Sequence, residues 1–230
     1  MKDILNNSMF FGVLVSILAY EVGVLLKKKF KFALLNPLLI SIVIIILILV
    51  GFHIDYDTYN DGAQLLSYLL TPATVCLAIP LYEQMELLKK NWKAIMSGII
   101  AGVLTSAVCV LVLCLIFRLE HEMFVTLLPK SITTAIGMGV SEELDGIVTI
   151  TVAVIIITGV VGNVMADFAY KLFHVTHPVA KGVGLGTSAH AIGTAKALEM
   201  GEIEGAMGGL SIAVADILTV IVAPIFSHII

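Results

Sequence analysis

Long apolar segments alternate with short polar segments along the whole chain. A helix that crosses the hydrocarbon core of a bilayer needs about 20 predominantly apolar residues. The segments that come closest to this length are residues 8–26, 34–52, 64–81, 92–117, 147–170 and 206–229. The pattern predicts an all-α polytopic membrane protein with about 6–8 transmembrane segments.

The composition excludes a soluble protein. Of the 230 residues, 59% are hydrophobic and only 13% are charged, whereas soluble domains are typically about a quarter charged and at most half apolar. We therefore expect one integral membrane domain over residues 1–230, with no soluble domain at either end and with the first apolar segment retained as a helix. The cysteines lie in apolar segments without a CxxC pair, which indicates packing residues: Cys76, Cys109 and Cys114.

The charged residues predict an orientation in the membrane. Lysine clusters at residues 27–31 and 89–93 belong on the cytoplasmic side by the positive-inside rule. The predicted loop at residues 53–63 carries aspartates and no cation, which favours the outer side. Lys171 and Lys181 follow the fifth span, and they are cytoplasmic only if the preceding polar segment turns back instead of crossing the membrane.

Two segments are rich in glycine, serine and threonine where a clean apolar span is expected. Residues 182–210 also hold His190 and Lys196, and residues 123–143 are interrupted by Pro129. Polar groups in hydrocarbon need hydrogen-bond partners, so such segments are costly unless protein surrounds them. We expect two discontinuous or re-entrant elements that line a polar path. Whether they cross the membrane or re-enter it stays open.

Short internal similarities suggest a duplication. TAIGMG at residues 134–139 resembles HAIGTA at residues 190–195. In a second comparison, four residues of the first half match four residues of the second half that each lie the same number of positions further along the chain. They are Thr71, Ala73, Glu83 and Glu86 against Thr187, Ala189, Glu199 and Glu202. Many transporters consist of inverted repeats whose broken helices meet at the bilayer midplane. The sequence therefore predicts a transporter-like inverted repeat, about 1–118 and 119–230, with a further interrupted segment at residues 71–80.

The interrupted segments supply the candidate substrate-binding residues. Their hydroxyl groups, and the backbone N–H groups beside glycine, favour a small carboxylate over a bare metal ion, because helix N-termini carry partial positive charge. Lys130 and Lys196 either add positive charge there or extend to an interface. The candidates are Thr71, Thr74, Ser131, Thr133, Thr134, Gly137, Thr187, Ser188, His190, Gly193 and Thr194.

Two titratable residues are candidates for ion coupling. Asp216 lies inside the last apolar segment, and an intramembrane carboxylate is a functional hypothesis by default. Alternatively, Asp216 is a partner for Lys196 or His190. His190 could relay a proton, or it could form only an interhelical hydrogen bond. Helical spacing would place His190 on one face with Gly186 and Thr194.

Sequence motifs for enzyme chemistry are absent. The chain contains no HExxH, GxSxG or P-loop motif, and GVGLG at residues 182–186 belongs to no βαβ pattern. We therefore expect no enzyme activity, no catalytic residues, no metal or cofactor, and no nucleic-acid binding.

Four segments together resemble the LrgB/CidB family, and the resemblance covers nearly the whole chain. They are NPLLISI at 36–42, LLTPATVCLAIPLYEQ at 69–84, LLPKSITTAIGMGVSE at 127–142 and GLGTSAHAIGTAKALEMGEIEGAMGGLS at 184–211. The resemblance implies a multi-pass protein of the bacterial plasma membrane, usually described as antiholin-like or as a regulator of murein hydrolase export. It also implies a small holin-like partner, LrgA or CidA. A related plastidal protein that fuses LrgA-like and LrgB-like parts is a glycolate/glycerate translocator.

Two functions of different classes follow. The first is a transporter for small monocarboxylates such as pyruvate or glycolate, with proton coupling as an option, that acts as a homo-oligomer in the lipid bilayer together with an LrgA/CidA-like membrane protein. The second is an antiholin-like regulatory subunit that modulates a holin-like pore, murein hydrolase activity and autolysis. A regulator needs packing surfaces, whereas a transporter also needs a substrate site.

Overall fold

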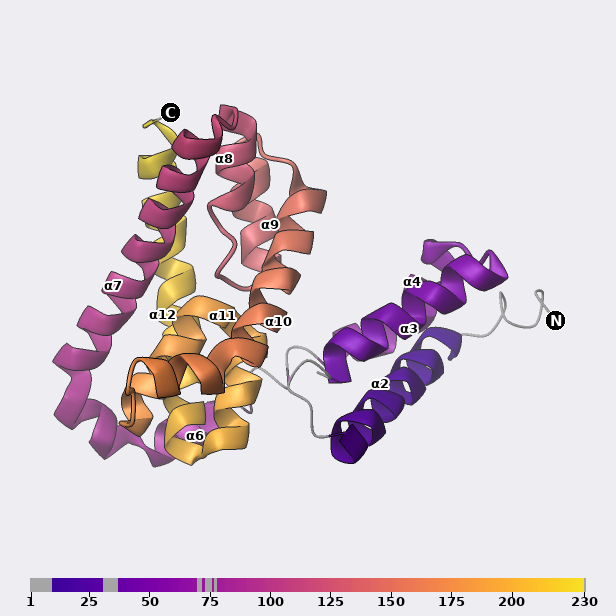
Figure 1. Ribbon diagram of the computed structural model, residues 1–230, viewed down its shortest axis with the longest axis horizontal. Helices are drawn as coiled ribbons and strands as arrows, with labels where there is room; N and C mark the ends of the chain where they lie inside the picture. Colours follow the sequence, from indigo (N-terminus) through magenta and orange to yellow (C-terminus); the bar gives the residue numbers. More distant parts are fainter. Residues whose placement is uncertain (1–9, 31–36, 70–71, 73–75, 77, 230) are drawn as a thin grey trace. The chain divides into compact units, whose positions relative to one another are not determined.

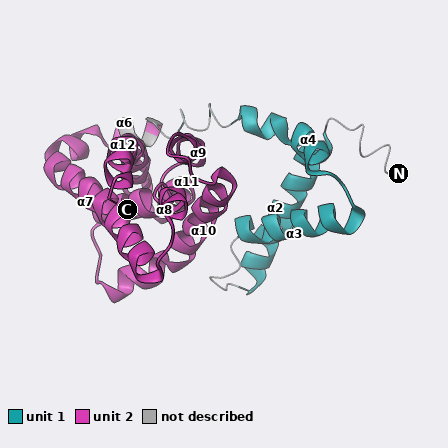
Figure 2. Ribbon diagram, turned by 90° about the horizontal axis from the view of Figure 1, so that it is seen from above, with its two compact units in different colours: residues 1–76 teal, residues 77–230 magenta. Residues whose placement is uncertain are grey.

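The computed structural model describes residues 10–30, 37–69, 72, 76 and 78–229, and within these ranges it is helical with no strand. This confirms the all-α prediction for the described residues. The chain separates into two compact units, Met1–Cys76 and Leu77–Ile230, which Figure 2 colours separately.

Unit 1 contains α2 (Phe11–Phe30), α3 (Pro37–Phe52) and α4 (Tyr56–Tyr68). Pro37 opens α3, in the first helical turn where proline is well tolerated. Helix α2 packs against both other helices, and a glycine allows each close approach. Gly12 of α2 lies against Gly62 of α4, and Gly23 lies against Pro37.

The predicted outer loop at residues 53–63 is wrong for most of its length, because α4 begins at Tyr56. Asp57 lies in the first turn of α4, where a negative charge is favourable. The Tyr59 hydroxyl lies 2.7 Å from the Ser16 hydroxyl of α2. Packing against α2 therefore stabilises a helix in a sequence whose polarity suggested a loop. Thr71 and Thr74 lie outside the described residues, so their predicted role stays a prediction.

Unit 2 holds the helices that best fit a membrane span. Among the described residues, three helices are long and apolar enough to cross a bilayer: α7 (Met85–Phe117), α10 (Val148–Leu172) and α12 (Glu202–Ser227). Figure 1 shows α12 running beside α7, and the short α6 (Ala78–Glu83) packs against both. The spans predicted at 92–117, 147–170 and 206–229 are confirmed as helices, although α7 and α12 start earlier.

Between α7 and α10 the chain forms two short helices, α8 (His121–Leu127) and α9 (Thr134–Glu143). After α9 the chain returns to α8, since the N–H of Ile147, directly before α10, donates to Thr126 Oγ1 at 2.8 Å. The Thr151 hydroxyl donates to Thr126 O at 2.9 Å and also lies 2.7 Å from Ser141 Oγ. We call residues 121–146 the first hairpin and residues 128–133 its tip.

Helix α11 (Pro178–Met200) is interrupted in the middle. Ala189 has φ −132° and ψ 17°, and His190 has φ 42° and ψ −137°, so neither is helical. A Cβ at Gly193 would lie only 2.5 Å from Leu185 O. Along a straight helix, Leu185 and Gly193 would be about 12 Å apart. The two halves of α11 therefore fold back on each other. We call α11 the second hairpin and Ala189–His190 its tip.

Small residues hold the second hairpin against its neighbours. Gly182 contacts the backbone of Glu204 at the start of α12, and Gly205 of α12 contacts Leu198 near the end of α11. Both ends of the second hairpin therefore lie near the start of α12. On α7, Gly98 and Gly102 face Val183 and Thr187 of α11. Their GxxxG spacing is typical of close helix contacts in membrane proteins.

Candidate functional site

The tip of the first hairpin and the first half of α11 both line a small cavity inside unit 2. Ser131 from the first hairpin and Thr187 from the second both line it, together with Ser106 of α7 and Thr219 of α12. The cavity volume is about 10 Å³, which is roughly the minimum that one water molecule requires. Four elements thus contribute one hydroxyl-bearing residue each to this cavity, and its other lining residues are apolar. In this conformation the cavity has room for about one water molecule.

Asp216 of α12 binds the N-terminal end of α9. Its Oδ1 accepts the backbone N–H of Thr133 at 3.0 Å, and its Oδ2 accepts the Thr133 hydroxyl at 3.0 Å. The Asp216 residue is only 5% exposed. A carboxylate at this position satisfies a free N–H of the helix end and interacts favourably with the helix dipole. The partner of Asp216 is thus Thr133, and not Lys196 or His190 as the alternative interpretation of the sequence had it.

His190 forms the tip of the second hairpin in a strained conformation. A positive φ is rare for a residue with a side chain and costs about 1–3 kcal/mol. The His190 Nε2 lies 2.9 Å from Ile155 O of α10, so Nε2 carries the hydrogen. A Cβ at Gly159 would lie 2.7 Å from His190 Cε1, so the ring packs directly on this glycine. The contact is an interhelical hydrogen bond, while the coupling role stays a prediction.

The prediction that Gly186, His190 and Thr194 share one helical face is wrong, because α11 is interrupted between them. Gly186 lies on the first half of α11 and Thr194 on the second, so with His190 they do not share one continuous helical face. The Thr194 hydroxyl is buried without a hydrogen-bond partner among the described residues. A helical threonine commonly bonds the carbonyl four residues earlier, and for Thr194 that residue is the non-helical His190.

The other candidates divide between the two hairpins. Gly137 of α9 faces Ile155, and Gly193 lies inside the fold of the second hairpin against Leu185. Thr134 is half-buried in the first turn of α9. Ser188 is exposed and donates to Gly184 O at 2.6 Å, so it does not join the cavity as the sequence predicted.

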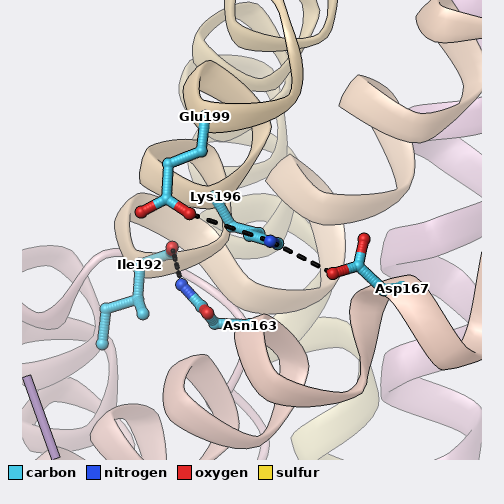
Figure 3. Close-up of polar contacts among 5 residues, drawn as sticks. All are labelled: Asn163, Asp167, Ile192, Lys196 and Glu199. Carbon is cyan, nitrogen blue, oxygen red and sulfur yellow. Dashed lines mark hydrogen bonds and ion pairs between the residues drawn. The ribbon is translucent and has the colours of Figure 1, made fainter. Parts of the chain in front are cut away.

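An ionic cluster fastens the second half of α11 to α10 (Figure 3). Lys196 Nζ lies 3.2 Å from Asp167 Oδ2 and 3.7 Å from Glu199 Oε2. One turn away, Asn163 Nδ2 donates to Ile192 O at 3.2 Å. The Asp167 side chain is 63% exposed, so its pair with Lys196 contributes about 1 kcal/mol or less. Lys196 thus forms ion pairs with carboxylates of its own chain. The cluster serves mainly to orient the second hairpin.

Lys130 does not line the cavity itself, but its ammonium group contacts Ser131, which does. Its Nζ donates to Ser131 Oγ at 2.9 Å, and Ser131 Oγ lies 3.2 Å from Ser106 Oγ. The sequence alone did not point to Ser106 or Thr219 as residues of the cavity. A signal for Thr219 existed, because it lies one helical turn after Asp216 and therefore near the same face of α12. Ser106 sits in an uninterrupted apolar helix and gave no local signal.

Known proteins match nearly the whole chain. The model of the LrgB-like family matches residues 16–229. The chain is 39% identical over 218 residues to the antiholin-like protein LrgB of Bacillus mycoides (strain KBAB4), with 94% of this chain and 95% of the relative covered. Proteins of the same name from Bacillus cereus (strain B4264) and Bacillus anthracis (strain CDC 684) match equally well. No solved structure matches the chain. With its several apolar helices, this multi-pass membrane protein belongs to the LrgB-like family.

Proposed function

We propose that this protein acts as an antiholin-like component of the bacterial cell membrane, together with an LrgA/CidA-like partner, and that its molecular activity is the transport of small monocarboxylates. The names of the relatives support the antiholin-like role more directly than they support transport. The transport activity rests on the structure of unit 2. A regulator without transport, acting only through packing surfaces, is the alternative.

One observation carries the transport proposal: the tip of the first hairpin and the first half of the interrupted α11 meet at one small cavity that holds four hydroxyl-bearing residues. Secondary transporters place substrate and ion sites where broken helices meet between repeats. The similar motifs TAIGMG and HAIGTA support such a repeat, because TAIGMG begins directly after the tip of the first hairpin, at Thr134, and HAIGTA begins in the tip of the second, at His190. The Asp216 carboxylate and the His190 imidazole beside these tips are our candidates for proton coupling.

We propose that the hairpins enter the membrane from opposite sides. Lysines gather where α7 starts and where α10 joins α11, whereas the junctions of α7 with α8 and of α9 with α10 are mainly acidic. The positive-inside rule makes the lysine-rich end cytoplasmic. The first hairpin then re-enters from outside, and the second re-enters from the cytoplasm.

This topology predicts which single cysteines share a side of the membrane. In a variant without the native cysteines, Glu120→Cys and Glu142→Cys should both react with an impermeant maleimide added outside the cell. Lys181→Cys should react only after the membrane is opened, and it is the matched control. All three positions lie at the ends of helices. A Glu142→Cys that reacts from the side opposite to Glu120→Cys would show that the first hairpin crosses the membrane.

Uptake into proteoliposomes tests the transport activity itself. The full chain, reconstituted with its partner, is expected to take up labelled pyruvate or glycolate with saturation. Thr187→Val removes a cavity hydroxyl and should raise the KM, because the site loses a polar contact. Ser188→Ala, whose hydroxyl is exposed, is the matched control and should change nothing. No saturable uptake under any ion gradient, together with retained control of autolysis in cells, would leave only the regulator.

A further inference from the structure

We propose that Lys130 is the binding residue for the carboxylate of the transported anion, at a site completed by Ser106, Ser131 and Thr219. The inference rests on the proposed transport function and assigns the charge that recognises its substrate. It starts from the environment of one side chain, Lys130, at the tip of the first hairpin.

Lys130 is a half-buried cation without a carboxylate partner among the described residues. It follows the buried Pro129, and the contact found for its Nζ is the neutral hydroxyl of Ser131. By contrast, Lys196 on the second hairpin contacts two carboxylates. A charged group at membrane depth is costly unless it is paired or serves a ligand or ion path. The unpaired charge of Lys130 is therefore available to an anion.

The hydrogen-bond directions around Lys130 also favour an anion. An ammonium group only donates, so Ser131 Oγ must accept from Lys130. The Ser131 hydrogen is then free to point to Ser106 Oγ, 3.2 Å away, or to a ligand in the cavity. A Na⁺ ion at this point would be repelled by the ammonium one hydroxyl away. A carboxylate would accept from Lys130 and from the hydroxyls together.

Asp216 explains why the anion would choose Lys130 over the nearby helix end. The N-terminal end of α9 is a general anion position, but the Asp216 carboxylate already occupies it through Thr133. The next positive group along the tip is Lys130. Because the cavity has room for about one water molecule, we expect the elements that line it to move apart when the substrate binds.

Binding to the purified full chain tests the assignment without requiring transport. The midpoint temperature of thermal unfolding in detergent is measured in the presence of pyruvate, acetate, the neutral amide pyruvamide, or chloride. We expect pyruvate and acetate to raise the midpoint temperature and pyruvamide to have no effect. Lys130→Met should weaken carboxylate binding by about 10- to 100-fold, as expected for loss of a charge-assisted hydrogen bond. Lys130→Arg should retain part of the affinity, and the exposed Lys171→Met is the matched control.

The stability of the ligand-free variants separates this role from a structural one. Replacement of an unpaired charge by an apolar side chain of similar length should leave the midpoint temperature of Lys130→Met unchanged or raise it. A clear fall without ligand would identify Lys130 as a structural partner and overturn the assignment. So would a Lys130→Met variant that binds carboxylates like the parent protein. Carboxylate binding that depends on Lys130, without any uptake, would uphold this site and refute the transport proposal alone.

Discussion

Replacing Gly186 by valine is expected to prevent the second hairpin from docking on α12. A Cβ at Gly186 would lie 2.5 Å from Gly208 O and 2.7 Å from Ser211 Cβ. The first of these atoms is backbone, so the clash can be relieved only by moving one helix away from the other. Overpacking of this kind costs about 1–3 kcal/mol and sometimes more, against a total stability of about 5–15 kcal/mol for typical proteins. Size-exclusion chromatography after heating should show a large loss of folded protein.

Gly139→Ala is the matched control for Gly186→Val. Gly139 also lies in a helix, α9, but a Cβ built there meets no atom within 4 Å. Alanine should therefore keep the midpoint temperature or raise it, since glycine in a helix interior is destabilising by about 0.5–1 kcal/mol relative to alanine. If both variants keep the parent protein's midpoint temperature, the close packing of α11 on α12 does not limit stability.

Asp216→Ala is expected to remove both transport and part of the stability. Alanine leaves the Thr133 N–H and hydroxyl without their acceptors. An unsatisfied buried polar group costs about 1–3 kcal/mol, so the midpoint temperature should fall. Because the first hairpin loses its bond to α12, its tip should also exchange amide hydrogens faster. Hydrogen exchange of residues 128–134, measured by mass spectrometry, checks this expectation.

Asp216→Asn isolates the charge from the hydrogen bonds. The amide oxygen can still accept the Thr133 N–H, and the amide NH₂ can donate to the Thr133 hydroxyl. The variant should therefore remain folded. If Asp216 carries the coupling proton, uptake driven by a proton gradient should be lost in Asp216→Asn while carboxylate binding persists. Uptake with the parent protein's proton dependence would remove Asp216 from the coupling mechanism and leave it as a helix cap.

The local sequence pattern determined the class of this protein and the places where its helices break. Hydrophobic length predicts α7, α10 and α12, because apolar side chains must face lipid or protein wherever they lie along a span. Glycine, proline and hydroxyl residues mark the two interrupted segments, because these residues tolerate or favour backbone that leaves the helix. The similar motifs TAIGMG and HAIGTA each begin close to the tip of a hairpin, at Thr134 and at His190.

Only the tertiary structure decided which polar groups meet. Asp216 binds Thr133, 83 residues away in the chain, and Lys196 pairs with Asp167 of α10 instead of Asp216. The predicted loop at residues 53–63 is largely helical because α4 finds a packing partner in α2. Periodicity reports which face of a helix is apolar, but the partner of a buried polar group depends on how helices far apart in sequence pack together.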